Sequence, residues 1–216
     1  MPTESALCAE FDASRYTVRE ALRLLVEQGF VTRRQKSGTV VIATARPRGY
    51  VQSVNTLAEL FQFALDTHYV VHDMAMVEID AEVAASVAGE AGSRWLRIGG
   101  IRTERPGGAV ICTTVSYVPE RLAWIGPELR QCIGPFYAHL ETRSGEAIAD
   151  AVQEIKAERM APHIAVALQA PPDSVALCLL RRYASIKGTM IASFNWHWAE
   201  RFVYRMHLQA GRIVGG

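Results

Sequence analysis

The sequence lacks most of the features that mark membrane, secreted and metal-binding proteins. No apolar run approaches the roughly 18 residues that a membrane-spanning helix needs. The acidic, polar N-terminus has no basic segment followed by an apolar stretch, so we expect no signal peptide. The scattered cysteines, Cys8, Cys112, Cys132 and Cys178, form no CxxC pair, which argues against a zinc site and a disulfide framework. We therefore expect a cytoplasmic protein with reduced thiols, no membrane attachment and no cofactor.

What the sequence does contain is enough apolar material for one or two folded domains. Half of the 216 residues are apolar and 21% are charged. The first 50 residues hold eight basic and five acidic side chains, whereas the remaining 166 hold fifteen and seventeen. A basic N-terminal segment on a mildly acidic body indicates an anionic partner for that segment.

Two short helices are predicted near the N-terminus. Residues 4–11 carry apolar side chains at helical spacing, with Phe11 at the end of the stripe. Ser14 stands where an N-cap residue is expected, because its hydroxyl can accept a hydrogen bond from the first turn. The second helix, residues 15–28, has an apolar stripe formed by Val18, Leu22 and Leu25.

Residues 15–42 also predict a basic helix surface and a β-hairpin. Opposite the apolar stripe lie three arginines spaced four residues apart: Arg15, Arg19 and Arg23. Two strand-like runs, 30–34 and 39–42, flank a basic turn that contains Lys36 and Gly38. Helix, turn, basic helix and basic hairpin is the arrangement of a winged helix-turn-helix, whose second helix enters the major groove of DNA. The alternative interpretation is a basic surface helix that packs on a small core and binds no DNA.

The motif residues in this stretch resemble the DNA-binding head of the GntR (gluconate-repressor) family of bacterial transcription regulators. The matching pattern is Pro2 and Glu4, then SRYTVREAL at 14–22, Gly29, and the wing pair Gly38-Thr39. The resemblance implies that arginines of the second helix read bases, and that its hydroxyls and the wing contact phosphates. The implied DNA-binding residues are Ser14, Arg15, Tyr16, Thr17, Arg19, Arg34, Lys36 and Gly38. It also implies a homodimer on a near-palindromic operator in double-stranded DNA.

The sequence departs from the family pattern at its beginning. The family's head starts with a further helix ahead of the Pro-x-Glu turn, to which this sequence has no counterpart, and Ser5 stands where an arginine is usual. Either the start is internal to a longer reading frame or the head is N-terminally incomplete. In the second case we expect an effector-binding and dimerisation protein with impaired DNA binding.

The rest of the chain is expected to form an α+β domain. We assign residues 1–43 to the head, 44–53 to a linker and 54–216 to the body. The body repeats the order helix, strand, turn, strand. The predicted helices are 56–68, 81–92, 135–143 and 162–170, and the predicted strands are 69–79, 95–104, 109–118, 147–157, 175–185 and 189–198. Residues 201–208 close the domain. Such an order gives an antiparallel sheet of about six strands with helices beside it.

This arrangement resembles the UTRA effector domain of the HutC subgroup, whose fold is like that of chorismate lyase. The segment WLRIGGIRTERPGGAVICTTVSYVPE, residues 95–120, carries the clearest similarity. The resemblance implies a small-molecule pocket between the two halves of the repeat. The effector-binding residues we expect are Arg102, Thr114, Ser116, Tyr137, Phe194, Trp196 and Trp198.

The sequence also suggests a class of effector. Gly100 stands where the subgroup's sugar-phosphate sensors often carry a second arginine, which leaves Arg102 as the one fixed cation that we identify. Phe194, Trp196 and Trp198 share one face of a strand because side chains alternate with period two. Together they predict a pocket for an aromatic or apolar carboxylate. The alternative is that this aromatic face is ordinary core.

An enzyme is the other class to consider, since the fold that the body resembles also occurs in a lyase. The sequence has no Gly-x-Ser-x-Gly, no His-Glu-x-x-His and no phosphate-binding loop. Fold does not determine function. We therefore expect a ligand-responsive repressor and no catalysis, with a chorismate-lyase-like enzyme as the alternative.

Overall fold

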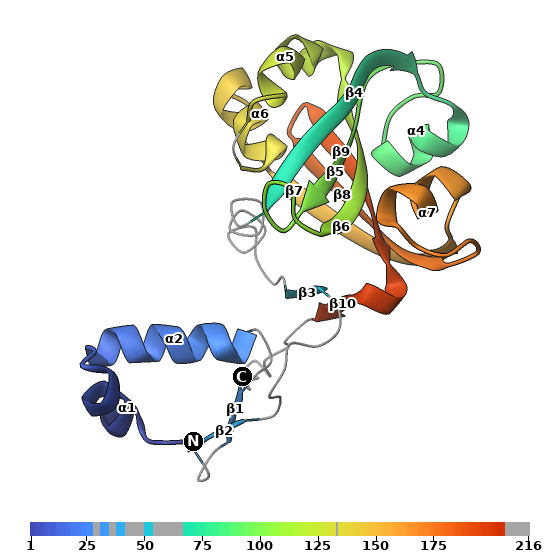
Figure 1. Ribbon diagram of the computed structural model, residues 1–216. Helices are drawn as coiled ribbons and strands as arrows, with labels where there is room; N and C mark the ends of the chain where they lie inside the picture. Colours follow the sequence, from blue (N-terminus) through green and yellow to red (C-terminus); the bar gives the residue numbers. More distant parts are fainter. Residues whose placement is uncertain (28–30, 35–37, 42–49, 54–66, 133, 206–216) are drawn as a thin grey trace, which may run out of the picture. The chain divides into compact units, whose positions relative to one another are not determined.

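The computed structural model describes residues 1–27, 31–34, 38–41, 50–53, 67–132 and 134–205 (Figure 1). The chain divides into two compact units, Met1–Ser53 with Val203–Gly216, and Val54–Phe202. The predicted helix 56–68 falls almost entirely outside the described residues, as do most of the linker and Lys36.

The first unit begins with two capped helices. In α1 (Glu4–Phe11) the Thr3 hydroxyl accepts a hydrogen bond from the Ala6 N–H at 3.2 Å, and Asp12 ends the helix in the left-handed conformation. In α2 (Arg15–Glu27) the Ser14 hydroxyl accepts from the Thr17 N–H at 3.1 Å, which confirms the predicted N-cap.

The core of this unit is small. Leu7 of α1 packs against Val18 and Leu22 of α2, with Leu25 half-buried beside them. The expectation that Phe11 extends this apolar stripe is wrong, because its side chain is 68% exposed. Phe11 is the last residue of its helix, so its side chain lies at the end of the core rather than over it.

Short strands follow. β1 (Val31–Arg34) and β2 (Gly38–Val41) pair antiparallel, with Val31 opposite Val41 and Arg34 opposite Gly38. This is the predicted wing. The end of the expected linker is itself a strand, β3 (Tyr50–Ser53), which pairs with β10 (Phe202–Arg205) near the end of the described chain. That pairing was not predicted from the sequence.

The second unit is built on one antiparallel sheet of six strands. They are β4 (His68–Glu78), β5 (Arg94–Thr103), β6 (Val110–Pro119), β7 (Asp150–Arg159), β8 (Val175–Ser185) and β9 (Gly188–Trp198). Their order is β4-β5-β6-β9-β8-β7, so β6 and β9 meet at the centre. The repeat is longer than predicted, because each half also contains the strand before its helix: β4-α4-β5-β6 and β7-α7-β8-β9.

Helices cover both faces of this sheet (Figure 1). α4 (Ala81–Val87) and α7 (Pro162–Leu168) lie on one face, which we call the α4/α7 face. The connection between the halves lies on the other, the α6 face, as η1 (Glu120–Ile125), α5 (Gly126–Leu129) and α6 (Phe136–Ser144). A single turn, η2 (Ala199–Arg201), precedes β10.

Each face has its own core. Under α6, Leu140 packs with buried residues of the sheet such as Ile98 and Val118. Under α4, Val87 packs against Trp95, and under α7 a third cluster includes Ile164 and Leu168. The sheet is thus covered by hydrophobic contacts on both sides, as expected for an α+β domain.

Both repeat helices end earlier than predicted. α4 stops before Ala88, which adopts φ +54° and donates its N–H to Ala84 O, and α7 stops at Gln169 with φ +53°. Left-handed residues terminate helices because they turn the backbone out of the helical path. Neither residue is a glycine, so the usual sequence signal for a helix end is absent.

Candidate functional site

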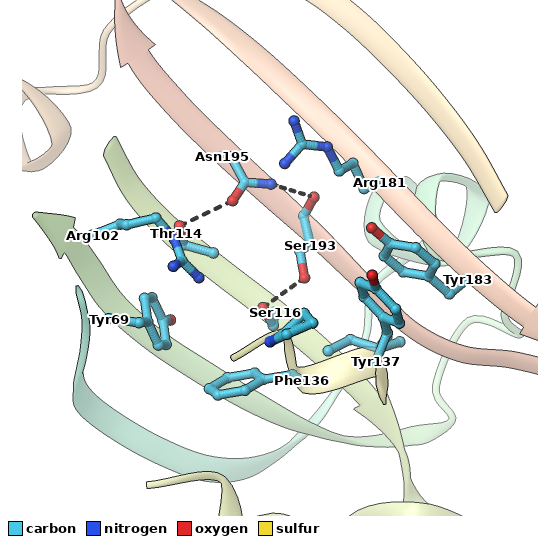
Figure 2. Close-up of a pocket in the computed structure, with 12 residues that line it drawn as sticks. Tyr69, Arg102, Thr114, Ser116, Phe136, Tyr137, Arg181, Tyr183, Ser193 and Asn195 are labelled. Atoms are coloured by element: carbon cyan, nitrogen blue, oxygen red, sulfur yellow. Dashed lines mark hydrogen bonds between the residues drawn. The ribbon is translucent and has the colours of Figure 1, made fainter. Parts of the chain in front are cut away.

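A small pocket lies on the α6 face, above the central strands β6 and β9 (Figure 2). Its floor consists of two cross-strand polar pairs. The Thr114 hydroxyl donates to Asn195 Oδ1 at 3.1 Å, and the hydroxyls of Ser116 and Ser193 are 2.7 Å apart. The strand register places these pairs directly opposite each other. The centre of the sheet, where the two repeats meet, is therefore polar on this face.

Two arginines flank that floor. Arg102 comes from β5 and Arg181 from β8, the strands on either side of the central pair. Arg102 Nη1 donates to Thr67 Oγ1 at 2.8 Å, and its guanidinium lies 5.2 Å from the centre of the Tyr69 ring. Arg181 is 8% exposed and donates from Nε to Gln153 Oε1 at 2.7 Å. The pocket thus has positive charge at both sides of its floor.

Aromatic rings form the rest of the wall. Tyr137 of α6 stacks on Tyr183 of β8, with ring centres 4.3 Å apart, and Phe136 meets Tyr69 edge to face at 5.1 Å. The cavity has a volume of about 70 Å³. Its described lining consists of Tyr69, Arg102, Thr114, Ser116, Pro135, Phe136, Tyr137, Arg181, Tyr183, Ile191, Ser193 and Asn195.

Tyr69 has an unusual setting in this wall. Its hydroxyl is buried and finds no hydrogen-bond partner among the described residues. Burial raises the pKa of the Tyr69 phenol, so the group stays neutral and can donate a hydrogen bond. Gly100 makes the position available, since a Cβ there would lie 2.2 Å from Val70 O and 3.0 Å from Tyr69 Oη. A ligand in the pocket would supply the missing acceptor.

The structure separates the expected effector residues into two groups. Arg102, Thr114, Ser116 and Tyr137 line this pocket together. The expectation that Phe194, Trp196 and Trp198 wall it with them is wrong. In β9, Ser193 and Asn195 face the pocket, so the residues that alternate with them, Phe194, Trp196 and Trp198, face the α4/α7 side.

On the α4/α7 face these aromatic residues line a separate hollow or pack in the core. The rings of Phe194 and Trp196 stack 5.7 Å apart and line a separate hollow of about 370 Å³ below α4. Trp198 packs against the core under α7. The alternative interpretation was that this aromatic face is ordinary core. It fits Trp198, but it fits Phe194 and Trp196 only in part, because they also line the hollow.

Eight of the twelve described lining residues were not expected from the sequence: Tyr69, Pro135, Phe136, Arg181, Tyr183, Ile191, Ser193 and Asn195. One of these could have been found from the repeat. Gly100 pairs with Thr114 in the first half and Arg181 with Ser193 in the second, so Arg181 holds the place in the second repeat that Gly100 holds in the first. The expectation that Arg102 is the one fixed cation of the pocket is therefore wrong. Arg181 is a second one, and it occupies the position in the second repeat that is equivalent to Gly100 in the first.

The exposed face of α2 is a second candidate site. Arg15, Tyr16 and Arg23 are exposed there, and Arg19 donates from Nε to Glu4 Oε2 at 2.8 Å. At the start of the helix the hydroxyls of Ser14 and Thr17 lie 2.8 Å apart.

In the wing, Arg34 ends β1 and Gly38 begins β2, directly opposite each other, while Lys36 lies outside the described residues. The described part of the head thus presents a helix with exposed arginines, followed by a hairpin.

In the described ranges, no three His, Cys, Asp or Glu side chains form a group that could hold a metal ion. No helix within those ranges is long and apolar enough to cross a membrane. The four cysteines are free thiols, and burial raises the pKa of Cys112 and, to about 12, that of Cys178. Such thiols are protonated at neutral pH and therefore poor nucleophiles.

Two family models match the chain. Residues 1–41 match "Bacterial regulatory proteins, gntR family", and residues 64–202 match the UTRA domain. The second match alone covers more than half of the chain.

Individual relatives agree with these matches. A protein of Escherichia coli (strain K12) named "Probable transcriptional regulator PhnF" is 28% identical over 184 residues, which cover 83% of this chain and 73% of the relative. The E. coli "Mannosyl-D-glycerate transport/metabolism system repressor MngR" is 61% identical, but only over 41 residues, 19% of this chain and 17% of that one.

A solved structure supports the fold. The crystal structure of PhnF from Mycobacterium smegmatis has a TM-score of 0.60 at 20% identity, and the similarity covers 98% of this chain and 92% of that one. Together with the winged helix-turn-helix and the repeated six-stranded sheet, these matches show that the chain belongs to the GntR family of bacterial regulatory proteins, with a UTRA domain as its second unit.

Proposed function

We propose that this protein is a transcriptional repressor of the HutC subgroup whose binding to DNA is controlled by a small anionic molecule in the α6-face pocket. The observation that carries the proposal is the pair of arginines, Arg102 and Arg181, across a floor of hydroxyl and amide groups. It acts as a homodimer on a near-palindromic operator in double-stranded DNA, in the cytoplasm where that DNA is found.

The pocket chemistry favours a phosphorylated or phosphonate effector. Guanidinium groups bind oxyanions through paired, charge-assisted hydrogen bonds, and two of them match a group that carries two negative charges. Hydroxyl and amide groups such as those of Ser116 and Asn195 suit a polar ligand body. The aromatic or apolar carboxylate expected from the sequence loses its main support, because Phe194, Trp196 and Trp198 lie on the other face.

The head supports control of transcription. Arg15 and Arg19 are exposed on a helix of the kind that enters the major groove, where an arginine can bond to guanine O6 and N7. The relative MngR, which is named as a repressor, shares 61% identity with this chain over 41 residues. We assign phosphate contacts to Ser14, Tyr16, Thr17, Arg34, Lys36 and Gly38.

We assign no reaction to the pocket. General acid–base chemistry needs a titratable side chain near the substrate. Among the described residues that line the pocket, none is Asp, Glu, His or Cys, and burial raises the pKa of Tyr69 and Tyr183 further from neutrality. Binding without chemical change is what a sensor requires.

Calorimetric titration tests the effector class. We would titrate the 216-residue chain with sn-glycerol 3-phosphate, 2-aminoethylphosphonate and 4-hydroxybenzoate. The proposal predicts binding of a phosphate or phosphonate, weakened about tenfold or more by Arg181→Met, because charge-assisted hydrogen bonds are lost. Arg182→Met is the matched control, since Arg182 is the next residue of β8 and bonds to Ser86 O of α4. Tight binding of 4-hydroxybenzoate alone would overturn the proposed effector class.

Fluorescence anisotropy tests DNA binding. The probe is duplex DNA from just upstream of the protein's own gene, titrated at several salt concentrations. Binding that weakens steeply with salt is expected, since basic side chains displace counterions from phosphates. The control is a scrambled duplex, measured like the first with and without the anion. Equal affinity for the two duplexes under both conditions would contradict the assignment as a repressor of that region.

A further inference from the structure

Glu4 is a residue to which neither the pocket nor the wing assigns a role. It is the first residue of α1, and its carboxylate reaches across to the middle of α2, where Oε2 accepts the hydrogen bond from Arg19 Nε at 2.8 Å. The contact joins residues fifteen positions apart and is the described ion pair between the two helices of the head.

This ion pair does little for the stability of the head. The side chains of Arg19 and Glu4 are 64% and 33% exposed, and exposed ion pairs contribute little to folding because water screens them. The helices are held together instead by Leu7, Val18 and Leu22. The pair is therefore of interest for what it does to Arg19 rather than for stability.

The geometry restricts how Arg19 can bind. A guanidinium can present either its Nε–Nη edge or its two terminal Nη groups to a partner. Glu4 occupies Nε, so a second partner meets the terminal Nη groups. A guanine base also needs two parallel donors, for O6 and N7. The carboxylate thus fixes one end of a flexible side chain and leaves the end suited to a base edge.

The charge of Glu4 acts in the same direction. A carboxylate beside Arg19 offsets the positive charge that would otherwise attract DNA phosphates of any sequence. Loss of this charge would strengthen non-specific binding, and loss of the hydrogen bond would release the guanidinium to contact phosphates.

On these grounds we propose that Glu4 is a positioning residue that orients Arg19 for one base pair of the operator and thereby sets specificity at that position. The inference rests on the proposed function, because it needs the head to read DNA.

The chain offers a matched control on the same helix. Glu20 accepts hydrogen bonds from Arg23 Nε at 3.0 and 3.1 Å, within α2 and one turn along. Glu20→Gln removes the same charge as Glu4→Gln and also weakens an arginine–carboxylate pair. It differs in leaving Arg19 held by Glu4.

The experiment begins with selection of duplexes from a randomised library by the full 216-residue chain. Affinities are then measured for the consensus and for each single-base variant. Glu4→Gln is expected to lower discrimination at one position by about fivefold, the lower end of what one arginine–base pair supplies. Arg19→Ala is expected to lose discrimination at the same position. Each ratio compares two duplexes with one protein sample, so it does not depend on the folded fraction.

Three outcomes decide the inference. Unchanged discrimination in Glu20→Gln, with lowered discrimination in Glu4→Gln, supports it. Equal effects of the two variants, or a loss in Glu4→Gln at a position that Arg19→Ala leaves intact, overturn the inference alone. A wild-type chain that selects no consensus overturns the proposed function and this inference together.

Discussion

At the scale of single residues, the environment of His197 strongly constrains its protonation. It is buried in β9, stacks on Phe202 with ring centres 3.7 Å apart, and bonds through Nδ1 to Ile111 O at 3.2 Å. A bond to a carbonyl requires the proton on Nδ1, and Nε2 has no partner in the described part of the chain. Burial lowers the pKa of His197 to about 3, and the positive charge of Arg181 acts in the same direction.

This setting predicts a loss of stability in mild acid. Between the unfolded pKa of 6.5 and the folded pKa of about 3, the unfolded chain binds the additional proton, so the free energy of unfolding falls as the pH falls. At about 1.4 kcal/mol per pH unit the loss between pH 7 and pH 5 is about 2 kcal/mol. Urea denaturation followed by tryptophan fluorescence measures it, because all four tryptophans belong to the second unit.

Two variants isolate the contribution of His197. His197→Phe keeps an aromatic ring against Phe202 and removes the titrating group, so its stability should change about 2 kcal/mol less over this pH range. His163→Gln removes an exposed histidine of α7 and should behave like the wild type. Equal pH dependence in all three proteins would mean that His197 is not buried as a neutral imidazole.

Single residues also explain the main error of the sequence analysis. The two-residue alternation of side chains along a strand correctly placed Phe194, Trp196 and Trp198 on one face of β9. It carries no information about which face α6 covers, and the less conspicuous Ser193 and Asn195 turned out to face the pocket. Small polar residues in a central strand were the available signal, since buried polar groups need a partner or a ligand.

At the scale of elements, Glu146 connects three segments. This almost fully buried carboxylate accepts hydrogen bonds from Arg121 Nη1 at 2.8 and 2.9 Å and from the Ser185 hydroxyl at 2.8 Å, and Lys187 lies 3.6 Å away. Burial opposes ionisation, but Ser185 and the two cations outweigh it and lower the pKa of Glu146. It ties η1 to the turn between β8 and β9.

Removal of this charge should therefore destabilise the second unit. Glu146→Gln is expected to lower the free energy of unfolding by about 1–3 kcal/mol, because Arg121 loses a charged partner in a partly buried place. Glu120→Gln, which breaks an exposed pair with Arg94, should cost no more than about 1 kcal/mol. Urea denaturation measures both changes. Equal losses in the free energy of unfolding would show that the contacts of Glu146 do not stabilise the second unit more than an exposed ion pair does.

α6 is the element that covers the pocket, and its packing can be tested separately. Leu140 is fully buried beneath it, so Leu140→Ala should cost about 2–5 kcal/mol through lost contacts and a cavity. Val166, on α7, is 79% exposed, and Val166→Ala should change stability by less than about 0.5 kcal/mol. Because α6 carries Phe136 and Tyr137, Leu140→Ala should also weaken anion binding.

The positions of helices and strands in the second unit were predictable wherever proline- or glycine-containing turn sequences flank them. The strand 175–185 was predicted with the bounds it has, between Pro171-Pro172-Asp173 and Lys187-Gly188. Helix ends were less predictable, because Ala88 and Gln169 adopt the left-handed conformation that sequence patterns assign to glycine. The pairing of β3 with β10 joins segments about 150 residues apart, and local patterns cannot reveal such contacts.

At the scale of the whole molecule, the proposed regulation requires that the anion and the DNA influence each other's binding. Linkage makes this influence reciprocal: the factor by which the anion changes DNA affinity equals the factor by which DNA changes anion affinity. Anisotropy and calorimetry should therefore give the same factor for the wild-type chain, within the range of about 5- to 150-fold that is typical. Different factors would show that the two measurements report different binding sites.

The contact between Arg102 and Thr67 is where the pocket meets the chain that leads back toward the head. Thr67 follows residues 54–66 in the sequence and precedes β4, and its hydroxyl accepts from Arg102 Nη1 at 2.8 Å. An anion bound as proposed would compete with Thr67 for the guanidinium of Arg102. Coupling requires such a difference in contacts between the two states. Thr67→Val should therefore leave anion affinity within about threefold and reduce the coupling factor toward one.

Thr142→Val is the control for this prediction. Thr142 is an exposed residue of α6 whose hydroxyl bonds to Ala138 O within the helix, and the same change there removes a hydroxyl without touching Arg102. Its coupling factor should equal that of the wild type. If Thr67→Val keeps the wild-type factor as well, the signal leaves the pocket by another route. Another candidate is then the end of β9, where His197 packs on Phe202 directly before the chain returns to the first unit.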